Sequence, residues 1–110
     1  MSNPGSDWEK TIIKYARVNG WRVHHSSKVK TKTGWLTPIG GDKGYPDLTM
    51  VREESILFVE CKTGMGRLSK DQEQWISQFK RATRGINNIG VHVWHPKDWP
   101  EIQRLLERVK

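Results

Sequence analysis

The chain has 110 residues, a formal net charge of +7 and one cysteine, Cys61. We expect one domain over residues 1–110, with residues 1–5 as an unstructured polar tail. One cysteine excludes an intrachain disulfide and a cysteine-rich zinc site, and no apolar stretch is long enough to cross a membrane. No signal peptide is visible, so a cytoplasmic protein is expected. The excess positive charge indicates a polyanionic partner, and it favours nucleic acid over a membrane surface.

The first predicted element is a helix that begins after Ser6. Ser6 and Glu9 match a capping box, and apolar residues follow at helical spacing: Trp8, Ile12, Ile13, Tyr15 and Ala16. Gly20 ends this helix, and residues 21–24 alternate like a β-strand. Residues 26–41 are basic, and we expect them to form a loop.

The middle of the chain predicts a β-hairpin. Residues 48–51 and 56–59 are rich in β-prone side chains, and the polar residues 52–55 between them favour a turn. A turn centred in this polar segment pairs positions whose numbers add up to 107.

This register brings charged side chains together at the open end of the hairpin. Asp47 falls opposite Glu60, and directly opposed residues share one face of the sheet, with Cβ atoms about 5 Å apart. Lys62 is two residues further on, so it joins the same face. Two opposed carboxylates favour a cation between them, and acidic oxygen ligands suit Mg²⁺ or Mn²⁺. The set is typical of phosphodiester cleavage. The alternative interpretation is a turn at Pro46-Asp47 and an exposed salt bridge within Glu60-x-Lys62.

Two helices and a strand complete the predicted order. Ser69 and Gln72 form a second capping box, which opens a helix carrying Trp75, Ile76, Phe79 and Ala82. Residues 90–94 are β-prone, and a last helix begins near Asp98 with Ile102, Leu105, Leu106 and Val109 on its apolar side. The order is α-β-β-β-α-β-α, which predicts an α/β fold.

Three motifs resemble those of the PD-(D/E)xK nuclease superfamily: Gly44-x-Pro46-Asp47, Glu60-x-Lys62 and Gly66-x-x-Ser69-x-x-Gln72. The chain is most similar to the small stand-alone VRR-NUC domains of phage and bacterial origin. The resemblance implies a restriction-endonuclease-like core, in which helices flank a central mixed β-sheet. It also implies endonuclease activity that depends on Mg²⁺ or Mn²⁺. Stand-alone members are associated with homodimers that act on branched DNA, such as four-way (Holliday) junctions.

The resemblance suggests a role for each motif residue. Asp47 and Glu60 would bind the metal together with the backbone carbonyl of Cys61. We expect the Cys61 side chain to be a small, buried group on the opposite face. Lys62 would act on the attacking water or stabilise charge on the phosphate, and the sequence leaves these two roles open.

Two further residues each keep two interpretations. Glu9 matches the acidic residue that this superfamily often carries on its first helix, where it reaches the metal, and it equally fits a helix cap. Gln72 matches a helix glutamine that positions water or phosphate, and it also fits the capping box with Ser69. The functional interpretation is favoured for Gln72, because Gly66 and Ser69 match as well.

The predicted DNA contacts lie near the motifs in the sequence. Trp35, in the basic segment, is a candidate for stacking on a base or packing across a dimer. The residues assigned to phosphate contacts are Lys28, Lys30, Lys32, Lys43, Arg67, Ser69 and Lys70. The four histidines lack the spacing of a metal site on a helix, so we assign them no metal.

Two other functions remain open from the sequence. One is a nicking or flap-type nuclease within a larger repair or phage assembly. The other is a non-catalytic, basic DNA-binding module. If the chain is phage-encoded, its expected location is the cytoplasm of the bacterial host.

Overall fold

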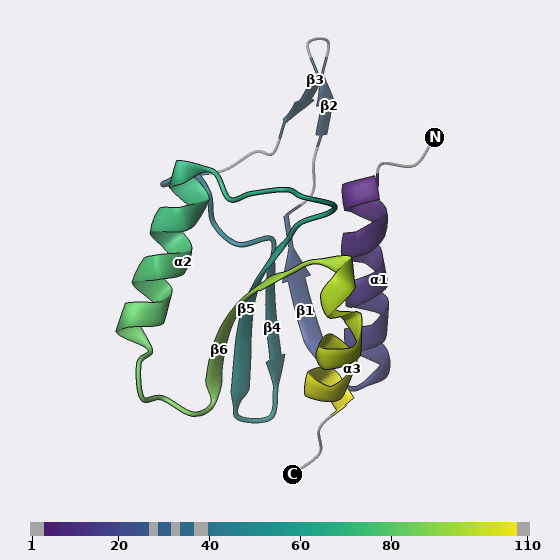
Figure 1. Cartoon of the computed structure of the whole chain (residues 1–110), viewed down its shortest axis with the longest axis vertical. Helices are drawn as coiled ribbons and strands as arrows, with labels where there is room; N and C mark the ends of the chain where they lie inside the picture. The colour runs from purple at the N-terminus through teal and green to yellow at the C-terminus, as the bar shows by residue number, and fades with distance from the viewer. Residues whose placement is uncertain (1–3, 27–28, 32–33, 37–39, 108–110) are drawn as a thin grey trace.

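The computed structural model describes residues 4–26, 29–31, 34–36 and 40–107 (Figure 1). The elements in these residues are, in chain order, α1 (Pro4–Val18), β1 (Arg22–His25), β2 (Val29–Thr31), β3 (Gly34–Leu36), β4 (Leu48–Arg52), β5 (Ser55–Cys61), α2 (Lys70–Ala82), β6 (Ile89–Trp94), the 3₁₀ turn η1 (Pro96–Asp98) and α3 (Trp99–Glu107). None of the helices in these ranges is long and apolar enough to cross a membrane.

A four-stranded mixed sheet with the order β1-β4-β5-β6 forms the centre of the fold. The pairs β1–β4 and β4–β5 are antiparallel, whereas β5 and β6 are parallel and are connected through α2. Helices α1 and α3 lie on one side of the sheet and α2 on the other (Figure 1). The predicted α/β fold with a central mixed sheet is therefore confirmed.

The main core lies between the sheet and the helices α1 and α3. Ile12, Leu48 and Leu106 are fully buried there. Trp8 and Trp21 also belong to this core, and their indole N–H groups donate 3.0 Å hydrogen bonds to main-chain oxygens of Trp94 and Leu106, respectively. Each indole thus buries its apolar rings while its one polar group is satisfied. These bonds connect α1 to β6 and the start of β1 to α3.

The β4–β5 hairpin has the predicted register. Its paired residues run from Leu48 opposite Val59 to Arg52 opposite Ser55, so each pair of numbers adds up to 107. Glu53 occupies the turn with a φ of 53°, in the left-handed region that side chains other than Gly, Asn and Asp seldom adopt.

The predicted order of elements was incomplete in the basic segment. The sequence predicts a loop over residues 26–41, but they contain β2 and β3, which form a separate two-stranded antiparallel sheet. The two strands have three residues each. Such short strands give too few alternations for a periodic pattern to stand out in the sequence.

The start of α1 also differs from the prediction. The sequence predicts Pro4 and Gly5 in the tail, but they belong to the helix, and Ser6 lies inside its first turns. Ser6 is therefore not the residue before the helix, so the predicted capping box with Glu9 is wrong. Proline is favoured in the first helical turn because its fixed φ suits the helix and its missing N–H is not needed there.

Candidate active site

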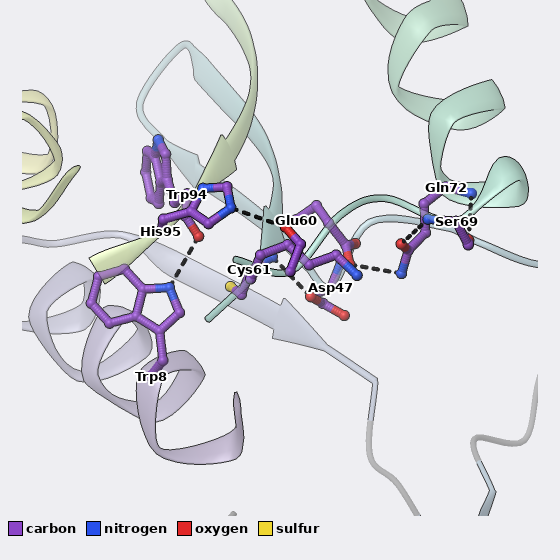
Figure 2. A network of polar contacts seen from close by, with 10 residues as sticks. Trp8, Asp47, Glu60, Cys61, Ser69, Gln72, Trp94 and His95 are labelled. Atoms are coloured by element: carbon purple, nitrogen blue, oxygen red, sulfur yellow. Dashed lines mark hydrogen bonds and ion pairs between the residues drawn. The ribbon is translucent and has the colours of Figure 1, made fainter. Parts of the chain in front are cut away.

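The open end of the β4–β5 hairpin brings two carboxylates together, as its register predicts. Asp47 directly precedes β4, and its main-chain N–H donates a 3.2 Å hydrogen bond to Oε1 of Glu60. In return, the Cys61 N–H donates a 2.9 Å hydrogen bond to Oδ2 of Asp47 (Figure 2). Each acidic side chain thus accepts from the other strand's backbone, so the hairpin itself sets the position of both groups.

Glu60 is buried among polar groups on the α2 side of the sheet. Only 2% of the residue is exposed. Its Oε2 atom accepts a 2.9 Å hydrogen bond from Nε2 of Gln72 and lies 3.8 Å from Nζ of Lys62. Burial, followed by the negative charge of Asp47, raises the pKa of Glu60 to about 8, and the positive charge of Lys62 opposes that rise. A cation placed beside this carboxyl would favour its ionised form.

Glu9 reaches the same place from α1. One carboxylate oxygen of Glu9, one of Asp47 and the sulfur of Cys61 all lie within 4.8 Å of one another. These are the only three side chains of ligand type that come together in this way within the described ranges. The acidic residue of the first helix therefore lies beside Asp47, which favours the metal-related interpretation of Glu9 over the helix cap.

The Cys61 side chain has the predicted direction, but its environment differs from the prediction. It packs against the core on the side of α1, whereas Glu60 faces α2. Its sulfur nevertheless lies next to the carboxylates of Glu9 and Asp47. Burial, with the charges of Asp47 and Glu9 in addition, raises the pKa of the Cys61 thiol above its usual range, so the thiol is protonated at neutral pH.

Gln72 forms the predicted capping box and also contacts Glu60. Oε1 of Gln72 accepts a 2.9 Å hydrogen bond from the Ser69 N–H, and Oγ of Ser69 accepts one of 3.2 Å from the Gln72 N–H. This is the predicted capping box at the start of α2. The amide nitrogen of the same side chain remains free of the cap and donates to Glu60. One residue therefore caps α2 and holds the buried carboxyl.

The loop that leads to Asp47 is held against the start of α2. Nε1 of Trp75 donates a 2.9 Å hydrogen bond to the Lys43 carbonyl. Gly44 has a φ of +95°, and a Cβ atom on it would lie 2.5 Å from the carbonyl carbon of Asp71. Only glycine permits this approach, so the loop and the helix meet backbone to backbone.

His95 is a residue at the edge of the site to which the sequence assigned no role. It follows β6, and its Nε2 atom lies 3.3 Å from the Gly66 carbonyl, in the loop after β5. Its main-chain N–H donates to Asp98. The signal for this local contact is an acidic side chain three residues after His95, the residue that follows the strand.

The predicted DNA-contacting residues divide into two groups. Lys43, Arg67, Ser69 and Lys70 are exposed in the loop before β4, in the loop after β5 and at the start of α2. The second group lies in the basic segment: Lys30 in β2 is paired with Trp35 in β3, while Lys28 and Lys32 lie outside the described residues. In Figure 1 this hairpin projects from the end of the molecule where α1 and α2 begin.

The sequence model of the VRR-NUC domain matches residues 25–96 of this chain. A comparison with curated protein sequences finds no match. The matched stretch, 72 of 110 residues when both ends are counted, includes Asp47, Glu60, Lys62 and Gln72, and Glu9 precedes it. The chain therefore belongs to the VRR-NUC family, whose members are nucleases of the restriction-endonuclease-like superfamily.

Proposed function

We propose that this protein is an endonuclease that depends on Mg²⁺ or Mn²⁺ and cuts four-way DNA junctions as a homodimer. Family membership implies the nuclease chemistry and, in general, a divalent metal ion. To this we add the choice of Mg²⁺ or Mn²⁺, the residues that bind the metal and the four-way junction as substrate. The observation that carries it is the convergence of Asp47, Glu60 and Lys62, with Glu9 beside Asp47 and Gln72 hydrogen-bonded to Glu60.

The oxygen atoms at this place fit a hard divalent cation. Carboxylate oxygens of Glu9 and Asp47 lie within 4.8 Å of each other. Asp47 is joined to Glu60 through a backbone hydrogen bond. We assign the metal to Asp47, Glu60 and the main-chain carbonyl of Cys61, with Glu9 as a further ligand, direct or through water. A divalent cation held there supplies Lewis-acid chemistry, which lowers the pKa of water and neutralises charge on a phosphate.

In this mechanism, the residues around the metal orient the attacking water and stabilise the charge of the phosphate. The Lys62 side chain is 20% exposed, and its Nζ atom lies 3.8 Å from Oε2 of the buried Glu60. Its ammonium group therefore contacts this carboxyl and is also accessible to a phosphate that approaches from the solvent. There Lys62 orients the attacking water or stabilises the negative charge that develops on the phosphate. Gln72 keeps Glu60 in place through Oε2. In-line attack of water then leaves a 5′-phosphate and a 3′-hydroxyl.

Charge and symmetry support the proposed substrate and oligomeric state. A net charge of +7 favours DNA, and we assign phosphate contacts to the exposed groups near the site and base stacking to Trp35. The phosphate-contacting residues are Lys28, Lys30, Lys32, Lys43, Arg67, Ser69 and Lys70. One active site cuts one strand, so two symmetric cuts in a junction require two copies related by a two-fold axis.

Cleavage of a labelled four-way junction tests the proposal, with linear duplex and flap substrates beside it. The reactions contain Mg²⁺, Mn²⁺ or EDTA and use the wild type and Lys62→Ala. Lys80→Ala is the matched control, because Lys80 is an exposed lysine near the other end of α2 from Gln72. We expect metal-dependent junction cutting by the wild type and Lys80→Ala, and binding without cutting by Lys62→Ala. Sedimentation of the protein–junction complex is expected to give two protein chains per junction.

Other outcomes would contradict specific parts of the proposal. Binding without cutting in every metal would leave a basic DNA-binding module. Cutting of flaps or linear duplex alone would retain the chemistry and replace the junction with a nicking or flap-type substrate. Equal activity of Lys62→Ala and the wild type would remove Lys62 from the mechanism.

A further inference from the structure

We infer that Glu9, Asp47 and Cys61 form a mixed sulfur–oxygen site for a thiophilic divalent cation such as Zn²⁺, which competes with the hard cation of the nuclease. The inferred binding of Zn²⁺ depends only on these three side chains. The competition rests on the proposed function, because it requires the hard metal to use Asp47.

The geometry brings three ligand atoms from three separate elements to one place. Glu9 comes from α1, Asp47 precedes β4, and Cys61 ends β5. Because the two oxygens and the sulfur lie within 4.8 Å of one another, some point lies within about 2.8 Å (4.8/√3) of all three. Zinc bonds are about 2.3 Å to sulfur and about 2.0–2.2 Å to oxygen. Movements of roughly 0.5–0.8 Å would bring the three atoms to bonding distance.

The types of these atoms determine which metal the site prefers. Mg²⁺ and Mn²⁺ favour oxygen ligands, whereas a thiolate ligand favours Zn²⁺ and Cd²⁺. Two carboxylates and one thiolate leave a fourth tetrahedral position for water, as in zinc sites with three protein ligands. The thiol proton passes to solvent as the metal–sulfur bond forms. All three side chains are only partly buried, so an ion can reach them from solution.

Competition follows because the two sites share residues. Oδ2 of Asp47 accepts the Cys61 N–H at 2.9 Å, so these two residues already lie against each other. A zinc ion bonded to Asp47 and to the Cys61 sulfur would remove an oxygen ligand from the hard cation and place a second positive charge beside it. The two ions therefore compete for Asp47.

A Cd²⁺ titration of the metal-free protein tests the site without DNA. The chain has a single cysteine, so the ultraviolet charge-transfer absorption of a cadmium–thiolate bond can arise only from Cys61. We expect this absorption to saturate at one equivalent and to disappear in Cys61→Ser. Glu9→Gln and Asp47→Asn should each weaken Cd²⁺ binding about tenfold or more while the thiol remains. Glu54→Gln, at an exposed glutamate in the β4–β5 turn, is the matched control and should titrate like the wild type.

The results that would contradict the mixed metal site differ from those that would contradict the nuclease proposal. No absorption, or an absorption with unchanged affinity in Glu9→Gln and Asp47→Asn, would mean that no mixed site exists. Zn²⁺ should displace Cd²⁺ from the site, and excess Mg²⁺ should not; the reverse order would overturn the assignment. Zn²⁺ added to a Mg²⁺ reaction should stop junction cutting, and continued cutting with Cys61 saturated by Zn²⁺ would overturn the competition. If Cd²⁺ binds as expected and no metal supports cleavage, the site stands and the proposed function fails.

Discussion

The charge of Glu60 depends on the groups that surround it. It is 2% exposed and has the carboxylate of Asp47 beside it, which together raise its pKa from 4.5 to about 8. In the metal-free protein near neutral pH, this carboxyl therefore keeps its proton in the folded state. Ionisation of Glu60 is then coupled to whatever positive charge enters the site.

This raised pKa predicts how the stability of the metal-free protein depends on pH. Between pH 4.5 and about 8, folded Glu60 holds a proton that the unfolded chain has released. Its contribution to the free energy of unfolding therefore falls as the pH rises through that window, by up to about 1.4 kcal/mol per pH unit. Urea unfolding in EDTA at several pH values, for wild type and Glu60→Gln, measures this. The dependence should be flatter in the variant, and equal slopes would contradict the buried, protonated carboxyl.

Gln72 has two contacts, and a substitution can separate them. Gln72→Glu keeps an oxygen that can accept from the Ser69 N–H, but it removes the amide group that donates to Glu60. Because Glu60 is a metal ligand in the proposed mechanism, we expect kcat to fall about 10–100-fold when the group that orients it is lost. Gln74→Glu makes the same change of charge at an exposed position of α2 and is the control. Equal rates for Gln72→Glu and Gln74→Glu would mean that Gln72 only caps α2 and that its contact with Glu60 does not contribute to catalysis.

At the scale of elements, the contact between Gly44 and α2 holds the loop before Asp47 in place. A Cβ atom at this position would lie 2.5 Å from the Asp71 carbonyl carbon, and the φ of +95° disfavours any other residue. Gly44→Ala should therefore lower the free energy of unfolding by roughly 1–3 kcal/mol or more. Gly40→Ala is the matched control, since no atom of the described residues beyond its chain neighbours lies within 4 Å of its added methyl group. It should change stability by less than about 0.5 kcal/mol, and a similar loss in both variants would contradict the contact.

The β4–β5 turn carries strain that a substitution can relieve. Glu53 has a φ of 53°, and asparagine tolerates that conformation better than glutamate does. Glu53→Asn should raise the free energy of unfolding by about 0.5–1 kcal/mol. Glu54→Asn removes the same charge at the next position, which lacks the positive φ, and should bring no gain. Equal effects in thermal or urea unfolding would assign the gain to charge rather than to the backbone.

At the scale of the whole molecule, the net charge of +7 predicts that DNA binding weakens with salt. Each phosphate contact contributes a slope of about −0.9 to a plot of log K against log salt. Replacing the three lysines of the basic segment by alanine should therefore reduce the slope by about 2–3: Lys28, Lys30 and Lys32. The control has the same net charge and replaces three exposed lysines elsewhere: Lys14, Lys80 and Lys97. Equal slopes for the two triple variants would contradict the assignment of the basic segment to DNA.

Much of the candidate site could be predicted from the sequence, because its parts are local. A polar turn and a period of two set the hairpin register, and the register places Asp47 opposite Glu60 with Lys62 two residues on. The capping box at Ser69 was likewise readable from a three-residue spacing. The strands of the basic segment are not predictable in this way, because β2 and β3 are too short to show a period.

The sequence by itself therefore determined the α/β class, the hairpin register and the motif residues, since each depends on contacts between near neighbours. Only the tertiary structure decided that Glu9 and the Cys61 sulfur lie beside Asp47, and that Gly44 touches Asp71. Those contacts depend on how α1 and α2 pack on opposite sides of the sheet. The packing is set by buried side chains far apart in the chain, such as Trp8 with Trp94, and no spacing along one segment encodes it.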